Sequence, residues 1–279
     1  MANAKKENGV NGGGMMTGII IASCIVVGIL VWKFIMGSAS NFENEKAMLE
    51  AGAEAGHPKE GNYLAMVYKG GAIVPVLLGC LLMVIVFSFE RFFVISKASG
   101  TGNLDKFMSN IQGNISQGNI EDAIATCDKQ KGSVANAIKS ALIKYQEVKK
   151  EGFNSEEASE MIHKEIEEAT SLEMPMLEKH MTILSTLVSL GTLAGLLGTV
   201  TGMIKAFGAL ASSGTPDQSM LANGISEALI NTATGISTSA LAIVMYNLFT
   251  SKIDTLTYSI DEAGTAIVNS YRRMRGSIK

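Results

Sequence analysis

The sequence contains few of the residues on which several classes of protein depend. Only 3 of its 279 residues are cysteines and 3 are histidines, and neither set has the spacing of a disulfide scaffold or a zinc site. We expect the cysteines to be packing residues: Cys24, Cys80 and Cys127. The net charge of −3 provides no basic surface for nucleic acid, so nucleic acid is excluded as a partner.

Hydrophobic residues, in contrast, make up 47% of the chain, and the mean hydropathy of +0.25 indicates a membrane protein. Four runs are apolar and long enough for the helix of about 20 residues that crosses a bilayer: residues 15–36, 71–95, 182–210 and 224–251. The first run is longer than the apolar part of a signal peptide, which is about 7 to 15 residues, so we expect a retained additional helix. A cleaved leader is the alternative.

The distribution of lysine and arginine predicts the orientation of the chain. Cationic residues collect on the cytoplasmic side of a membrane. They are present at the start of the chain, between the second and third runs and in the tail, whereas the loop between the last two runs has none. Three lysines in residues 37–70 count against this scheme, but the alternation of four spans places that segment outside. We predict cytoplasmic segments 1–14, 96–181 and 252–279 and external segments 37–70 and 211–223.

The long cytoplasmic segment is expected to be helical. Its apolar residues recur at helical spacing, and Gly113, Gly118 and Gly132 are expected to break it into short pieces. A long helix should then begin near Ser155 and continue into the third span, with a bend at Pro175 as its only interruption. The pattern "HKEIEE" lacks the order of a zinc motif, so we expect no metal and assign the histidines of this helix to a solvated face: His163 and His180.

The third apolar run contains "GLLGTVTGM", an unusual composition for a helix that faces lipid. Its glycines form two small-xxx-small pairs that allow another helix to approach closely: Gly191 with Gly195, and Gly198 with Gly202. Three hydroxyl residues share one side of the helix: Ser189, Thr192 and Thr199. This side is suited to a protein neighbour or to water.

The fourth run carries an acidic residue, Glu227, inside an apolar helix, which is costly and marks a functional hypothesis. The same stripe of the helix holds further polar residues: Asn231, Thr234 and Thr238. Thr232 lies about 140° round the helix from Glu227, so only one of the two can point straight into a single lumen, and the sequence leaves open which. The alternatives are structural: Glu227 caps the helix at the interface, or it pairs with Lys205 at the end of the preceding span.

Together the motifs "GLLGTVTGMIKAF", "GISEALINTATGISTSALAIVMYNLF" and "SFERFFVI" resemble the MotA/TolQ/ExbB proton channel family, and the ExbB/TolQ branch most. The resemblance covers about residues 71–279. It implies an all-α membrane protein that assembles as a homo-oligomeric ring of five copies around two copies of an ExbD-like partner, whose aspartate is the protonatable group. It places Thr199, Glu227 and Thr232 on the ion path. The chain departs from the family in lacking an Ala-Pro pair before "GLLGT" and in having Lys205.

The resemblance further implies an inner-membrane motor subunit that uses the proton motive force to energise TonB-dependent outer-membrane transport through a TonB-like protein. A TolQ-like role in envelope maintenance and a flagellar or gliding stator are the alternatives, and a non-conducting membrane scaffold is a third. No catalytic constellation or nucleotide motif is present, so we expect neither an enzyme nor a cofactor. The choice between proton and sodium is open.

Overall fold

The computed structural model describes residues 3–43, 57–212 and 218–276. Within these ranges the chain is predominantly helical, and its only β-type pairing is one isolated bridge between Phe42 and Pro58. The chain divides into two compact units. Unit 1 comprises Met1–Ser88 and Ile183–Met245, and unit 2 comprises Phe89–Thr182 and Tyr246–Lys279.

Unit 1 contains the apolar helices. Its elements are α1 (Asn3–Leu30) with a π-helical continuation (Val31–Met36), a 3-10 turn (Ala39–Asn41), α3 (Tyr63–Tyr68), a second 3-10 turn (Gly71–Ile73), the first part of α4 (Val74–Ala98), most of α9 (Met181–Ser212) and the first part of α10 (Gln218–Gly276). Four helical segments are long and apolar enough to cross a membrane: Gly14–Met36, Gly71–Ala98, Ser155–Gly208 and Gln218–Met274. The prediction of four candidate spans is therefore confirmed.

The helices extend beyond the apolar runs from which they were predicted. The first helix begins at Asn3, inside the segment expected as the N-terminal tail. The expected loop 211–223 is largely helical, because α9 continues to Ser212 and α10 begins at Gln218. The tail 252–276 continues α10, since intrahelical hydrogen bonds need no apolar side chains. Parts of the expected segments 37–70 and 211–223 lie outside the described residues.

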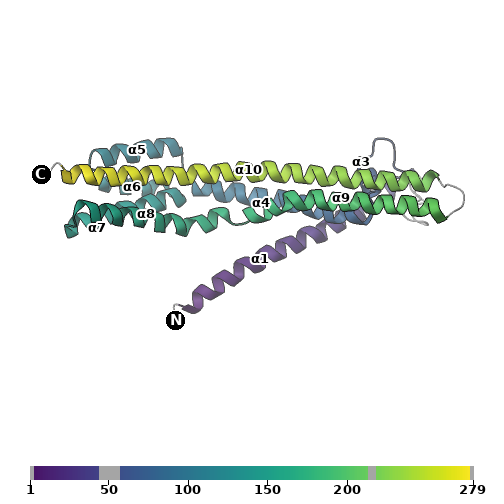
Figure 1. Ribbon diagram of the computed structural model, residues 1–279, viewed down its shortest axis with the longest axis horizontal. Helices are drawn as coiled ribbons and strands as arrows, with labels where there is room; N and C mark the ends of the chain where they lie inside the picture. Colours follow the sequence, from purple (N-terminus) through teal and green to yellow (C-terminus); the bar gives the residue numbers. More distant parts are fainter. Residues whose placement is uncertain (1–2, 44–56, 213–217, 277–279) are drawn as a thin grey trace. The chain divides into compact units, whose positions relative to one another are not determined.

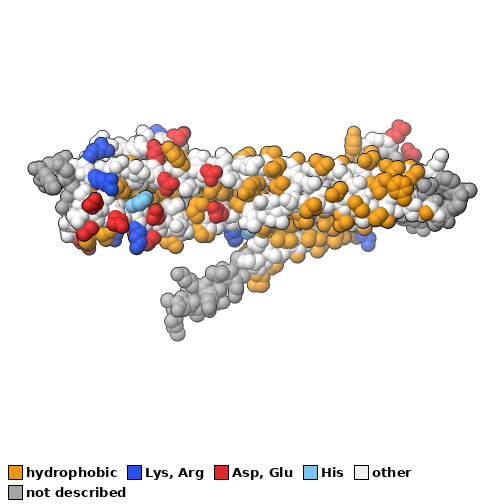
Figure 2. All heavy atoms as spheres, in the orientation of Figure 1, with side chains coloured by type: hydrophobic (Ala, Val, Ile, Leu, Met, Phe, Trp, Pro, Cys, Tyr) orange, Lys and Arg blue, Asp and Glu red, His pale blue; other side chains and the backbone are white. Residues whose placement is uncertain are grey.

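Unit 2 is a bundle of amphipathic helices. Its elements are α5 (Leu104–Ser116), α6 (Ile120–Gln130), α7 (Gly132–Glu151), α8 (Ser155–Glu178), the end of α4 and the second part of α10. Side-chain caps start two of the helices: Asn103 accepts from the backbone of α5, and Asn154 accepts from that of α8. The α5 helix runs along α10 (Figure 1), and Ser270 of α10 donates to the carbonyl of Ile115. Figure 2 shows charged side chains distributed over this unit.

Two of the three glycines expected to break the cytoplasmic segment do so. Gly118 and Gly132 have φ values of +77° and +87°, which favour glycine, and they lie between α5 and α6 and at the start of α7. The prediction for Gly113 is wrong. This glycine lies inside α5, where an added Cβ would meet nothing within 4 Å, so no packing forces a break there.

The break between α8 and α9 differs from the predicted bend at Pro175. The α8 helix passes through Pro175 and ends at Glu178, and the chain turns at His180, whose φ is +66°. The guanidinium of Arg91 explains the position, because it is 1% exposed and donates to the carbonyls of Met176 (3.0 Å) and Leu177 (3.2 Å). A cation thereby satisfies acceptors that the end of a helix leaves open.

The expectation that both histidines lie on a solvated face is wrong for His180 and holds for His163. The ring of His180 is 8% exposed, and its Nδ1 lies 3.0 Å from Oε2 of Glu90. Glu90 also accepts two hydrogen bonds from Arg91, at 2.5 and 2.7 Å. His163 is exposed and lies 3.6 Å from Glu167 on its own helix. The partner of His180 is 90 residues away in sequence, so no local pattern announces it.

Candidate functional site

A line of glycines joins α9 to α10 in unit 1. The four glycines that the sequence singled out on α9 are all buried: Gly191, Gly195, Gly198 and Gly202. A Cβ added at Gly195 would lie 3.0 Å from the carbonyl oxygen of Asn231 and 3.1 Å from Cα of Gly235, both on α10. The two backbones therefore touch. We call this contact the glycine seam.

The other side of α9 carries large apolar side chains that are exposed in the single chain. They include Leu190, Leu193, Leu196, Leu197, Val200, Ile204 and Phe207. Figure 2 shows hydrophobic side chains gathered over this part of unit 1. An exposed apolar face of this size on a membrane helix is covered by lipid or by another protein chain.

Two pairs of hydroxyl groups meet across the glycine seam. The hydroxyls of Thr199 and Thr232 are in direct contact, and both also bond to the carbonyl of Ala228, at 3.4 and 3.2 Å. About two turns away, Thr192 donates to the hydroxyl of Ser239 at 2.9 Å. The structure thus brings Thr199, Thr232 and Thr192 of the predicted residues to one contact between α9 and α10.

The remaining predicted hydroxyl residues do not join this contact. Thr234 and Thr238 donate to carbonyls one turn back on their own helix, at 2.8 and 2.9 Å, and Thr238 is fully buried. Ser189 is exposed on α9. Thr199 and Thr232 also have such bonds, to the carbonyls of Gly195 and Ala228, both at 3.2 Å. What distinguishes them from Thr234 and Thr238 is the second hydroxyl that each of them contacts across the seam.

The carboxylate of Glu227 lies on the other side of the seam. Lys205 of α9 donates to its Oε1 at 2.7 Å, and the side chain of Glu227 is 14% exposed whereas that of Lys205 is 60% exposed. The backbone of Gly71 lies close to the carboxylate of Glu227 on another side. Gly71 has φ +77°, and a Cβ there would overlap the carboxylate, so both conformation and space favour glycine.

The stripe of α10 that contains Glu227 packs against the segment that leads into α4. Asn231, which is fully buried, donates to the carbonyl of Gly70 at 2.8 Å, and Lys69 contacts Asn223 at 3.5 Å. The Oδ1 atom of Asn231 has no hydrogen-bond partner among the described residues. The sequence predicted Asn231 as a lining residue. It could not show that residues 69–71, which are more than 150 residues away in the chain, pack against the stripe of α10 that contains Asn231.

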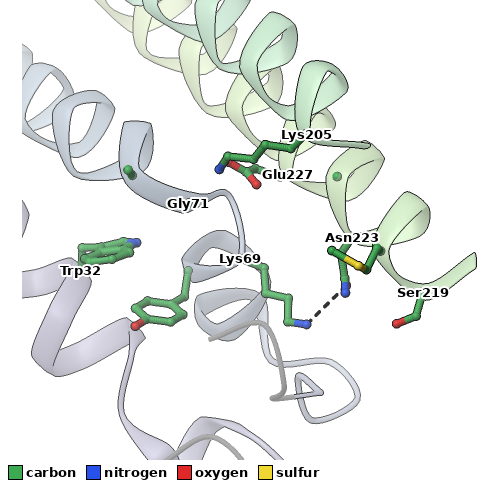
Figure 3. Close-up of a pocket in the computed structure, with 11 residues that line it drawn as sticks. Trp32, Lys69, Gly71, Lys205, Ser219, Asn223 and Glu227 are labelled. Carbon is green, nitrogen blue, oxygen red and sulfur yellow. Dashed lines mark hydrogen bonds and ion pairs between the residues drawn. The ribbon is translucent and has the colours of Figure 1, made fainter. Parts of the chain in front are cut away.

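A pocket of about 380 Å³ opens beside Glu227 (Figure 3). Trp32, at the end of the first helix, stacks on Tyr68 with ring centroids 4.7 Å apart. Other lining residues come from the end of α3, the 3-10 turn before α4, the end of α9 and the first turns of α10, including Lys69, Gly71, Lys205, Ser219, Asn223 and Glu227. The indole N–H of Trp32 is buried without an acceptor among the described residues. Sequence reasoning missed this pocket, because its walls come from segments that are distant in the sequence.

Neither the glycine seam nor the pocket resembles a metal centre. Over the ranges that the structure describes, no three histidine, cysteine, aspartate or glutamate residues are grouped so that they could hold a metal ion. All three cysteines are buried free thiols. The chemistry that the seam offers is therefore that of hydroxyl groups, which can order water or coordinate a cation and which do not titrate near neutral pH.

Comparison with known proteins identifies the domain that contains this site. The sequence model of the MotA/TolQ/ExbB proton channel family matches residues 134–262. This range includes all of α9 and the part of α10 that contacts α9.

Several curated relatives match over a shorter stretch. The chain is 34% identical over 88 residues to the biopolymer transport protein ExbB-like 3 of Synechocystis sp., 35% identical over 88 residues to the Tol-Pal system protein TolQ of Haemophilus influenzae, and 31% identical over 85 residues to the biopolymer transport protein ExbB of Salmonella typhimurium. These matches cover 31%, 32% and 30% of the chain, and 42%, 39% and 35% of the respective relatives. The chain thus spans about two fifths of the length of the curated relatives it matches. With the four apolar helices, these findings show that the chain is a membrane protein that carries a domain of the MotA/TolQ/ExbB proton channel family.

Proposed function

We propose that this protein is the ExbB-like subunit of an inner-membrane proton channel that uses the proton motive force to energise TonB-dependent outer-membrane transport. The observation that carries the proposal is the contact between the hydroxyls of Thr199 and Thr232 inside the matched domain. Two hydroxyls across a close helix pair can order water in an apolar surrounding, as a proton path requires. The family is one of proton channels, which gives no support to an enzymatic role.

The proposed path is completed by other chains. Hydroxyl groups do not titrate near neutral pH, and Glu227 is held by Lys205, so the exchangeable proton is carried by the aspartate of an ExbD-like partner. In this proposal five copies of the chain surround two copies of the partner, and the exposed apolar side of α9 faces neighbouring copies and lipid. Both termini lie in the cytoplasm. Each proton that crosses releases about 2.3 kcal/mol per 100 mV, so mechanical work requires several protons.

A TolQ-like role is the second candidate. Its support is specific, because the TolQ of Haemophilus influenzae is 35% identical to this chain and the ExbB of Salmonella typhimurium is 31% identical, over stretches of almost equal length. The two roles share the same channel, and the partner that receives the force distinguishes them. A flagellar or gliding stator and a non-conducting scaffold remain as outcomes of the tests below.

The first test replaces the hydroxyl of Thr199 without changing its shape. Thr199→Val should abolish growth on an iron chelate that enters only through active outer-membrane uptake, in cells lacking their own copy. The matched control is Thr201→Val, because the hydroxyl of Thr201 bonds only to Leu197 and Gly198 of its own helix among the contacts found. Crosslinking checks that the ring and partner still assemble.

The outcomes separate the candidate functions. Loss of uptake in Thr199→Val alone, with intact assembly, supports the channel. Normal uptake combined with new sensitivity to detergent supports the TolQ-like output, and loss of motility supports a stator. Full function of both variants would refute a path through Thr199 and favour a scaffold.

A charge exchange tests whether Glu227 acts beyond its ion pair. If Glu227 serves only to pair with Lys205, the double variant Lys205→Glu with Glu227→Lys should restore what Glu227→Gln loses. If the carboxylate belongs to the proton path, the double variant should assemble and remain inactive. The contact at 2.7 Å makes the exchange geometrically feasible.

A further inference from the structure

The pocket beside Glu227 lies where several membrane helices end together. Its walls come from the end of the first helix, the end of α3 with the 3-10 turn before α4, the end of α9 and the first turns of α10, all within unit 1. Each of these segments passes there from an apolar run to polar residues. Trp32 and Tyr68 stack at the same level, and these two residue types are enriched where a membrane meets water. The pocket therefore lies at the depth of lipid headgroups.

The lining combines charges of both signs. Lys69 and Lys205 contribute ammonium groups, and Glu227 contributes a carboxylate. Asn223 and Ser219 add polar groups on the α10 side, and Figure 3 shows Lys69 and Asn223 joined at one side of the pocket and Lys205 with Glu227 at another. A purely anionic ligand would meet the carboxylate, and a purely cationic one would meet the two ammonium groups. A ligand with one charge of each sign matches both.

The size and an unmet hydrogen bond also indicate an occupant. A volume of about 380 Å³ is within the range of about 300–1,000 Å³ that small-molecule sites occupy. The indole N–H of Trp32, one of the lining residues, is buried and lacks an acceptor among the described residues. Buried polar groups nearly always have a hydrogen-bond partner, so the indole N–H is expected to find its acceptor outside the single chain.

We propose that the pocket binds a zwitterionic phosphate ester with a primary ammonium group, carried as the headgroup of a membrane phospholipid of the phosphatidylethanolamine type. The phosphate lies toward Lys69, and the ammonium lies toward Glu227 and the faces of Trp32 and Tyr68, which attract cations. Lys205 is mostly exposed and can turn from Glu227 toward the phosphate. The acyl chains extend along the exposed apolar residues of the first helix, such as Leu30 and Ile35.

Trp32 is the single tryptophan of this chain, so the tryptophan fluorescence of the chain reports on its stack with Tyr68 beside the pocket. The purified chain in a maltoside detergent is titrated with dihexanoyl phosphatidylethanolamine, with dihexanoyl phosphatidylglycerol, with soluble phosphoethanolamine and with inorganic phosphate. We expect a saturable change of emission with phosphatidylethanolamine and an effect at least tenfold weaker with phosphatidylglycerol. A saturable change with phosphoethanolamine alone would uphold the headgroup chemistry and overturn the lipid as its source.

Variants separate binding in the pocket from a general effect of lipid on the fluorescence. Lys69→Gln should weaken the phosphatidylethanolamine response at least tenfold, and Lys69→Arg should retain it. Lys33→Gln is the matched control, because Lys33 neighbours Trp32, lies 5.9 Å from the ring of Phe34 and does not line the pocket. Circular dichroism confirms that each variant is folded, and Lys205→Gln provides a second test if Lys69→Gln is not. An equal response to both lipids, or an unchanged response in Lys69→Gln, would overturn the proposal.

Discussion

Replacing Arg91 by alanine should loosen the end of α8. The guanidinium is buried and makes four hydrogen bonds, two to the carbonyls of Met176 and Leu177 and two to the carboxylate of Glu90. Removing one member of a buried ion pair costs about 3–5 kcal/mol, because the other member loses its compensation. The side chain of Glu90 is 35% exposed and retains its contact with His180, so we expect a smaller cost, of about 2–3 kcal/mol.

This cost should be measurable as local opening. Since each 1.4 kcal/mol corresponds to a factor of ten, hydrogen exchange of the backbone amides of residues 176–178 should accelerate by about 30- to 140-fold. The amides in the middle of α7 should exchange as before. Mass spectrometry of peptides from the detergent-solubilised protein gives both rates in one experiment.

A matched arginine serves as the control. Arg272 is exposed and donates one hydrogen bond, to the hydroxyl of Ser159 at 3.2 Å. Arg272→Ala should change exchange at the end of α8 by less than a factor of three. If Arg91→Ala behaved like Arg272→Ala, the guanidinium would not be what ends α8 at Glu178, and the explanation of the break at His180 would fail.

Two further predictions concern packing and ionisation. Gly195→Ala should lower the thermal stability of the purified protein by the equivalent of about 1–3 kcal/mol, because the added Cβ would press on Asn231 and Gly235. Gly208→Ala is the control: its Cβ would meet nothing within 4 Å, so it should raise the stability by up to about 1 kcal/mol, and a gain in both variants would contradict a tight seam. Burial raises the pKa of the Cys127 thiol from 9.0 to about 12, so between these values the unfolded chain releases a proton that the folded chain keeps. The resulting stabilisation is complete below pH 9 and is lost as pH rises. In chemical unfolding the wild type should lose about 1 kcal/mol relative to Cys127→Ala between pH 9 and pH 10, and parallel curves would refute the shift.

Hydropathy alone was sufficient to predict the four apolar helices. Polar side chains are costly in lipid, so each helix that crosses a membrane needs a run of about 20 apolar residues, and such a run is visible in the sequence. It could not predict where the helices end. The α10 helix has 59 residues, and its second part is amphipathic rather than apolar, so the apolar run ends long before the helix does. The bend expected at Pro175 failed for another reason: the turn at His180 depends on Arg91, which is distant in sequence.

For the polar residues of the membrane helices, too, the sequence predicted one part of the arrangement and not the other. Helical spacing grouped the glycines of α9, and they do lie together against α10. It also grouped Ser189 with Thr192 and Thr199, but Ser189 is exposed and does not join their contact with α10. Spacing could not show which face meets which neighbour. Asn231 was grouped with Glu227 on one stripe, and this stripe packs against Gly70 and Gly71, whose place in the fold no local pattern indicates.

The positions of Thr232 and Glu227 on α10 lead to a last prediction about the lumen. The line of small residues on α10 that touches α9 contains Gly224, Ala228 and Gly235, and Thr232 and Glu227 flank it on opposite sides. Thr232 meets Thr199 on one side, and Glu227 meets Lys205 and the backbone of Gly71 on the other. Because the Gly71 side is already covered by the chain itself, we expect Thr232 and not Glu227 to face the lumen of the assembled ring.

Cysteine accessibility tests this orientation in a background in which the three native cysteines are replaced. Thr232→Cys in the assembled ring should react with a small water-soluble thiosulfonate, and co-expression of the ExbD-like partner should slow that reaction, because the partner's helix occupies the same space. Glu227→Cys should react at a rate that the partner does not change, since its side chain lies toward Gly71. The reverse pattern, with protection of position 227 alone, would place the lumen on the other side of the glycine seam and would make the hydroxyl pair a packing contact.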